Sequence, residues 1–239
     1  MRQTRMTTLV ACTTVLLAVC MFGNRARADQ YNPVIDPANF STKIDNPFLP
    51  MRPGTTYTYK GMTAEGNETN TVEVTRSTRL IMGVTCVEVV DTAVVNGALA
   101  ELTHDFFAQD KQGKVWYFGE DSKEYANGVV VSTEGSWIAG ENGALPGIVM
   151  EANPQVGDQY RQEFSKGVAE DMAEVLSLTG TADVPYGSFT DCVVTKDFSR
   201  LDKKSVENKW YARGVGFVKS IAVVGSTDIS ELVKVTGPK

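Results

Sequence analysis

The feature that most constrains the fold is a series of short segments rich in Val, Thr, Tyr and Phe, separated by turn residues. Apolar and polar residues often alternate within these segments, and a helical period is almost absent. The predicted strands are 55–60, 70–77, 84–91, 101–108, 113–118, 158–164, 172–182, 190–198, 206–213, 215–223 and 226–235. The chain is therefore predicted to be all-β or nearly so, an antiparallel meander that forms a curved sheet, a half-barrel or a β-sandwich.

Two parts of the chain resemble each other at a nearly constant spacing. The sequence "GVTCVEVVDT" at 83–92 is similar to "FTDCVVTKDF" at 189–198, and "PGTTYTYKG" at 53–61 parallels "VGDQYRQEF" at 156–164. This pattern indicates an internal duplication, with a first β repeat at 53–118, a Gly-rich connecting segment at 119–154 and a second β repeat at 155–239. The alternative is chance similarity among β-strands.

The first 28 residues have the pattern of a secretory signal peptide. Two arginines in "MRQTR" precede eighteen uncharged residues, and "ARA" at 26–28 is a cleavage-like tripeptide. We expect cleavage after Ala28 and a secreted or periplasmic protein, with no transmembrane segment after cleavage. A membrane anchor is the alternative, and a lipoprotein signal would use Cys20. The next segment, 29–52, contains four prolines and is predicted to run extended.

Charge restricts the partners of the remaining chain. The first 28 residues hold four arginines and no acid, so the rest carries 19 basic and 29 acidic residues and a net charge of −10. A surface this negative repels phosphate backbones, so nucleic acid is not expected as a partner. It could attract cations.

Two cysteines, Cys86 and Cys192, lie beyond the predicted signal peptide and occupy matching places in the two repeats. Two cysteines in an oxidising compartment favour one disulfide. If a pseudo-two-fold axis relates the repeats, the two residues can meet near that axis. We therefore predict a Cys86–Cys192 disulfide.

Several segments carry a resemblance to known proteins. The opening of the chain beyond residue 28, with "TTYTYKG" at 55–61, "AQDKQGKVWYFGED" at 108–121, "EGSWIAGENGALPGIVM" at 134–150 and "AEDMAEVLSL" at 169–178, resembles a family of secreted bacterial proteins without an assigned activity. That resemblance supplies no catalytic residue. The segment "KWYARGVGFVKS" at 209–220 resembles a strand pair of the periplasmic lipid-carrier superfamily of half-open β-barrels, which implies a concave apolar sheet.

No catalytic pattern stands out in the sequence. The single histidine, His104, lies within a predicted strand, which argues against a Ser/His/Asp triad and a multi-histidine metal site. No Gly-rich phosphate loop follows a strand and opens a helix. We predict a binding protein rather than an enzyme, without a cofactor.

The leading hypothesis is capture of an apolar or amphipathic small molecule between the curved sheet and the 119–154 segment. Trp137, within that segment, should lie against the concave face with its indole N–H bonded to a polar group. The candidate ligand-binding residues are aromatic, although core packing explains most of them equally well: Tyr57, Tyr59, Phe106, Trp116, Trp137, Trp210 and Tyr211.

A hard-cation site is the alternative, because carboxylates gather near the end of the first repeat. Ca²⁺ needs about six oxygen ligands, so at least three of these groups would have to converge. The candidates are Asp105, Asp110, Glu120, Asp121, Glu124 and Glu134. Solvated surface acids are the ordinary explanation of such a group. A structural envelope or interaction module is the third possibility.

Overall fold

The computed structural model describes residues 31–238, so the predicted signal peptide lies outside the described residues. The chain from residue 33 onward forms one long antiparallel sheet with a single short 3₁₀ helix, η1 (Pro37–Asn39), among the described residues. The prediction of an all-β fold is confirmed.

The strands follow one another mainly as hairpins. Their bounds are β1 (Phe40–Ser41), β2 (Thr56–Thr63), β3 (Gly66–Ile81), β4 (Val84–Val95), β5 (Ala98–Asp110), β6 (Val115–Ala126), β7 (Val129–Ser132), β8 (Trp137–Ile138), β9 (Leu145–Met150), β10 (Gln159–Arg161), β11 (Glu163–Phe164), β12 (Asp171–Val184), β13 (Gly187–Ser199), β14 (Val206–Ala212), β15 (Gly216–Val224) and β16 (Ile229–Thr236). Every predicted strand overlaps one of these, and β7 to β9 lie in the connecting segment. The duplication itself stays a prediction.

Two hairpins show why the sequence turns where it does. Asn96-Gly97 joins β4 to β5 and Asn127-Gly128 joins β6 to β7, and all four residues have positive φ. Two-residue turns of this kind match the twist of the flanking strands, and Asn and Gly adopt positive φ more readily than other residues.

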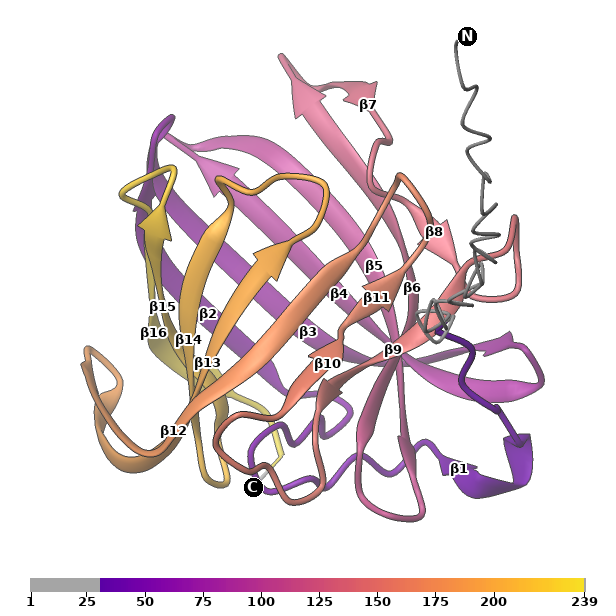
Figure 1. The fold of residues 1–239 in the computed structure, drawn as a ribbon. Helices are drawn as coiled ribbons and strands as arrows, with labels where there is room; N and C mark the ends of the chain where they lie inside the picture. The colour runs from indigo at the N-terminus through magenta and orange to yellow at the C-terminus, as the bar shows by residue number, and fades with distance from the viewer. Residues whose placement is uncertain (1–30, 239) are drawn as a thin grey trace, which may run out of the picture. The chain divides into compact units, whose positions relative to one another are not determined.

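The sheet curls into a nearly closed barrel (Figure 1). Its strand order is β10-β12-β13-β14-β15-β16-β2-β3-β4-β5-β6-β9-β11, so β16 pairs with β2 and joins the two halves of the chain. The remaining gap lies between β12 and β9. The continuous segment 159–164 crosses it, because its first part, β10, pairs with β12 and its second part, β11, pairs with β9.

The barrel interior is identified by the side chains that meet across it. Val89 on β4, Val193 on β13 and Tyr211 on β14 belong to one buried cluster, which strands so far apart in the sheet can form only through the concave side. Met150 on β9 is fully buried in the same cluster. Side chains alternate along a strand, so every second residue points into the barrel except where β-bulges shift the register, as between Asp105 and Phe107 on β5.

The predicted disulfide is wrong. Cys86 and Cys192 are free thiols, each fully buried. Cys86 lies in a cluster with Phe106 and Phe118, whereas Cys192 lies in a different cluster with Val218. Five strands separate β4 from β13 along the sheet, so the curvature of the barrel keeps these matching positions apart instead of bringing them to a common axis.

Candidate functional site

The inward face of the barrel changes from apolar to acidic along the neighbouring strands β4 and β5. On β5 the inward residues run Phe107, Asp105, Thr103, Glu101, because Phe107 packs on the interior cluster and side chains alternate. On β4 the series continues from Val89 to Asp91, which pairs with Thr103. One end of the barrel is thus packed with apolar side chains and the other carries carboxyl groups.

A pocket of about 610 Å³ occupies the acidic end, which we call the mouth. It lies where the β2–β3, β4–β5 and β6–β7 hairpins reach the end of the barrel. Its acidic lining residues are Glu65, Glu68, Glu101, Glu124 and Asp228. Its other lining residues are Thr63, Ala64, Ala93, Val95, Ala100, Tyr125, Ala126 and Val131. None of the described residues that line this pocket is basic.

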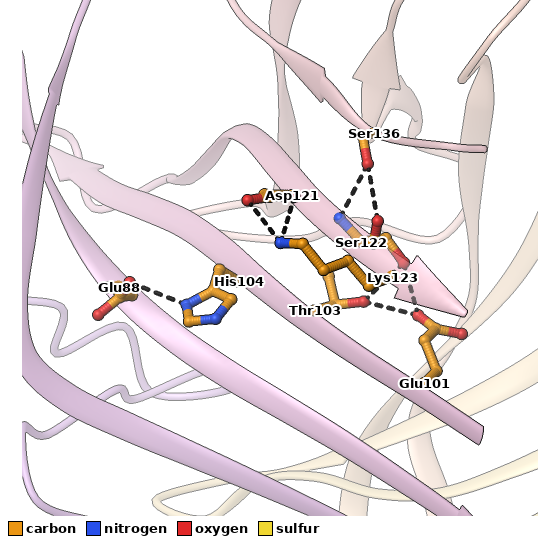
Figure 2. A network of polar contacts seen from close by, with 8 residues as sticks. All are labelled: Glu88, Glu101, Thr103, His104, Asp121, Ser122, Lys123 and Ser136. Atoms are coloured by element: carbon orange, nitrogen blue, oxygen red, sulfur yellow. Dashed lines mark hydrogen bonds and ion pairs between the residues drawn. The ribbon is translucent and has the colours of Figure 1, made fainter. Parts of the chain in front are cut away.

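A hydrogen-bond network fixes one wall of the mouth. Thr103 Oγ1 lies 2.6 Å from Glu101 Oε1 and 2.9 Å from Ser122 Oγ, and Ser122 Oγ donates to Glu101 at 3.1 Å. The backbone N–H of Ser122 donates to Ser136 Oγ at 2.9 Å, which links β6 to the turn before β8 (Figure 2). These contacts hold the Glu101 carboxylate in place beside the pocket.

Two aspartates lie deeper in the barrel. Burial raises the pKa of Asp91 to about 7, and the negative charges of Glu101 and Glu68 also raise it. Hydrogen bonding to Asn70 acts in the opposite direction and lowers this pKa. Burial likewise raises the pKa of Asp105 to about 7, against the hydrogen bond that the Tyr117 hydroxyl donates to it. Removal from water destabilises the charged carboxylate, so these groups hold their protons up to near-neutral pH.

Two glutamates with raised pKa values lie near the closing segment. Burial raises the pKa of Glu120 to about 9, with Glu163 and Asp105 as the next causes. Burial and the neighbouring Asp171 raise the pKa of Glu163 to about 8. The hydrogen bond from Trp137 lowers this pKa but does not cancel the rise. Trp137 Nε1 donates to Glu163 Oε2 at 2.8 Å, so the predicted polar partner of this indole is confirmed.

His104 lies on the opposite face of β5 from the inward-facing carboxyl groups. It neighbours Thr103 and Asp105 in sequence, so its side chain points to the outer face. Its Nδ1 lies 3.0 Å from Glu88 Oε1, apart from the Glu101 network (Figure 2). A histidine that acts as a general base is hydrogen-bonded to a nucleophile such as serine or cysteine. Among the described residues, the side chain bonded to His104 is that of Glu88.

The predicted ligand-binding aromatics do not form one surface. Tyr57, Tyr59, Tyr211 and Trp137 belong to or pack on buried clusters, and Tyr59, Tyr211 and Trp137 are at most 6% exposed. Tyr59 donates to the carbonyl of Phe217 at 3.1 Å and Tyr57 to that of Pro50 at 3.2 Å. The hydroxyl groups of Tyr57 and Tyr59 are therefore hydrogen-bonded within the protein.

The other three aromatics lie on outer faces of their strands. Phe106 and Trp116 belong to the cluster beneath Phe40, whose ring meets that of Trp116 edge-on at 6.0 Å. Trp210 lies on β14 next to the inward Tyr211 and packs on the cluster around Cys192. The structure therefore divides the predicted set among three separate buried clusters.

The six predicted cation ligands are also divided. Asp105, Glu120 and Glu124 face the interior or the mouth. Asp110 accepts the indole N–H of Trp116 at 2.9 Å, Asp121 pairs with Lys123 at 2.9 Å, and Glu134 is exposed at a turn. In the described part of the chain no group of three or more His, Cys, Asp and Glu side chains could hold a metal ion.

The connecting segment forms a second, smaller pocket of about 350 Å³ on the side of the barrel. Trp137, Ile138 and Ala144 supply apolar lining, and Glu120 and Ser165 supply polar lining. Of the seven aromatics predicted to line a cavity between the sheet and this segment, Trp137 alone lines this side pocket. The mouth pocket is larger and lies elsewhere.

The sequence interpretation missed several acidic residues of the interior. Glu68, Asp91 and Glu101 were not singled out, because they lie on three different strands. The available signal was alternation: a carboxylate two residues from a core position on a strand shares its face. Asp91, two residues after Val89, is an example.

Comparisons with known proteins add little. No protein-family model matches the sequence, and no curated protein matches it. The barrel is similar to a solved structure of a protein described as a putative lipoprotein from Parabacteroides distasonis ATCC 8503, with 15% sequence identity and a TM-score of 0.44. The match covers 79% of this chain and 98% of that one. No helix in residues 31–238 is long and apolar enough to cross a membrane.

Proposed function

We propose that this is a binding protein whose barrel mouth takes a small amphipathic molecule with a positively charged group. The observation that carries the proposal is the lining of the 610 Å³ pocket, in which five acidic residues face a wall of alanine and valine and no described lining residue is basic. A cation would lie against the carboxylates, and its apolar part would contact Ala93, Val95 and Val131.

The volume and chemistry of the pocket favour an organic cation over a hard metal ion. Ca²⁺ requires several oxygens at about 2.3–2.6 Å around one point, and the described residues do not provide such a group. An ammonium group tolerates looser geometry, because a single carboxylate can pair with it. The predicted signal peptide is in keeping with ligand capture outside the cytoplasm.

Isothermal titration with decylammonium, decanoate and decanol, each below its aggregation concentration, tests the proposal. We expect saturable binding of decylammonium that weakens as salt is added, and no saturable binding of decanoate. Saturable decanoate binding as tight as that of decylammonium, or no binding of any of the three, would overturn the proposal.

Glu101→Gln is the matched variant, because the amide oxygen can still accept from Thr103 and Ser122. It should weaken decylammonium binding about tenfold, equivalent to about 1.4 kcal/mol. Glu134→Gln removes an exposed carboxylate outside the pocket and should leave the affinity unchanged.

A further inference from the structure

Two hydrogen-bond acceptors near the mouth are buried and accept no hydrogen bond from the described residues. They are Oδ1 of Asn70, on β3, and Oδ1 of Asp228, in the turn before β16. Removing an acceptor from water without giving it a donor costs free energy, and most buried polar groups in proteins are paired. Both atoms can therefore gain from a ligand that carries hydrogen-bond donors.

Asn70 lies one inward position deeper in the barrel than Glu68. The two residues share the inward face of β3, because they are two positions apart on an unbroken ladder with β4. Ala93 lies opposite Asn70 on β4. Glu68 and Ala93 both line the mouth pocket, so the pocket reaches the level of Asn70.

Asp228 borders the mouth pocket from the second half of the chain. It lines both this pocket and a neighbouring pocket of about 460 Å³. No ion pair or side-chain hydrogen bond joins Asp228 to another described residue. Its carboxyl group can therefore turn toward a ligand in the pocket without breaking a hydrogen bond.

The two acceptors are too far apart for one ammonium group. Asn70 lies opposite Tyr59 on β2, and Tyr59 lies opposite Leu232 on β16. Two strand spacings of about 4.8 Å therefore separate Asn70 from β16, and Asp228 lies four residues, about 13 Å, before Leu232 along the chain. The α-carbons of Asn70 and Asp228 are thus about 15 Å apart. Two short side chains and one ammonium group do not span this distance.

The charge of the mouth accommodates more than one cation. Five acidic residues line the pocket, and none of its described lining residues is basic. One ammonium group leaves most of this negative charge uncompensated, whereas a second one reduces the repulsion among the carboxylates further. Ala93, Val95 and Val131 offer apolar contacts to a linker between two such groups.

We propose that the ligand of the mouth is an elongated molecule with two or more primary ammonium groups, of the diamine or polyamine class. One ammonium group donates to Oδ1 of Asn70 beside Glu68, and another donates to the Asp228 carboxylate. This inference rests on the proposed function and adds to it the class of cation and the two residues that recognise its N–H groups.

Isothermal titration at about pH 7, where alkylamines are protonated, tests the inference with three probes of one chain length. They are 1,10-diaminodecane, decylammonium and decane-1,10-bis(trimethylammonium). The diamine should bind at least about tenfold more tightly than decylammonium, because its second ammonium group gains a carboxylate. The bis(trimethylammonium) probe has the same two charges without N–H donors and should bind at least about tenfold more weakly than the diamine.

The outcomes separate this inference from the function on which it rests. Saturable decylammonium binding with a diamine that binds no more tightly would overturn the inference and leave the proposed function standing. A bis(trimethylammonium) probe that binds as tightly as the diamine would do the same, because charge alone would then explain the affinity. No saturable binding of any probe would overturn both.

Asp228→Ala is the decisive variant, because the side chain has no hydrogen bond or ion pair with a described residue whose loss would disturb folding. It should reduce the preference for the diamine over decylammonium to less than about threefold. Glu65→Ala removes another carboxylate of the pocket, at an exposed residue, and should weaken both probes alike. An unchanged preference in Asp228→Ala, or an equal loss of preference in Glu65→Ala, would reject Asp228 as a recognition residue.

Asn70→Leu tests the other acceptor without a change of charge. Leucine has nearly the shape of asparagine but no acceptor, so the diamine and decylammonium should both bind about fivefold more weakly. The affinity of the bis(trimethylammonium) probe should stay the same, because that probe has no N–H to lose a partner. Equal weakening of all three probes would show that Asn70 shapes the pocket and does not recognise N–H groups.

Discussion

The two ends of the barrel interior differ although the same strands build them. At one end Val89, Phe107 and Met150 pack into a cluster with little exposed surface. At the other end the same strands place Asp91, Glu101 and Asp105 on the inward face. Apolar packing drives folding, whereas buried carboxyl groups oppose it whenever they ionise. The comparison indicates that apolar packing at one end stabilises the barrel, whereas ionisation of the buried Asp91 and Asp105 opposes folding.

The largest contrast should come from truncating a side chain at each end. Met150→Ala leaves a cavity in the packed end and should reduce the free energy of unfolding by about 3 kcal/mol. Val131→Ala at the mouth, where the side chain is 61% exposed, should change it by less than about 0.5 kcal/mol. Urea unfolding of both variants measures the difference, and equal losses would contradict the division of the interior.

The next contrast concerns pH. The Asp105 pKa is raised to about 7, so the folded state keeps a proton that the unfolded state loses near pH 4. The stability contribution of this group is therefore full below about pH 4 and is lost as pH rises to about 7. Asp105→Asn should stabilise the protein by about 2 kcal/mol at pH 8 and have little effect at pH 4. Its amide oxygen can still accept from Tyr117.

Unfolding measured at the two pH values checks this prediction. A gain of the same size at pH 4 and pH 8 would show that ionisation of Asp105 is not the cause. Leu232→Ala, at a fully buried apolar position, is the control, because its loss of stability should be the same at both pH values.

A smaller effect is expected where the packed and acidic ends meet, at Trp137. The Trp137→Phe variant keeps an aromatic ring against Tyr117, which the indole meets edge-on at 5.4 Å, but leaves Glu163 without its indole donor. The free energy of unfolding at pH 6 should fall by about 1 kcal/mol. Chemical unfolding measures it, and a loss above about 3 kcal/mol would mean that packing dominates over the hydrogen bond.

The smallest effect concerns the two free cysteines. Both are fully buried, and burial raises the pKa of the Cys86 thiol to about 12. A reducing agent should leave the melting temperature unchanged, and a thiol reagent should label both residues only after unfolding. A mass two daltons below that of the dithiol form, or a melting temperature that falls on reduction, would restore the disulfide.

The sequence by itself determined the strands and their turns. Alternation of apolar and polar residues is a local property, and Asn-Gly pairs define hairpins without help from distant residues. The predicted strands 84–91 and 101–108 became β4 and β5, and the same alternation already placed Asp105 on the face of Phe107. The prediction of an all-β chain therefore needed no knowledge of tertiary contacts.

Only the tertiary structure decided which strands meet. The pairing of β16 with β2 and the crossing of the gap by 159–164 join residues far apart in sequence, and local patterns do not specify such pairs. That arrangement separates Cys86 from Cys192, which sequence similarity had brought together. It also gathers Glu120, Glu163 and Asp171 from three strands, and their shared burial, which raises the pKa values of the two glutamates, exists only in the folded barrel.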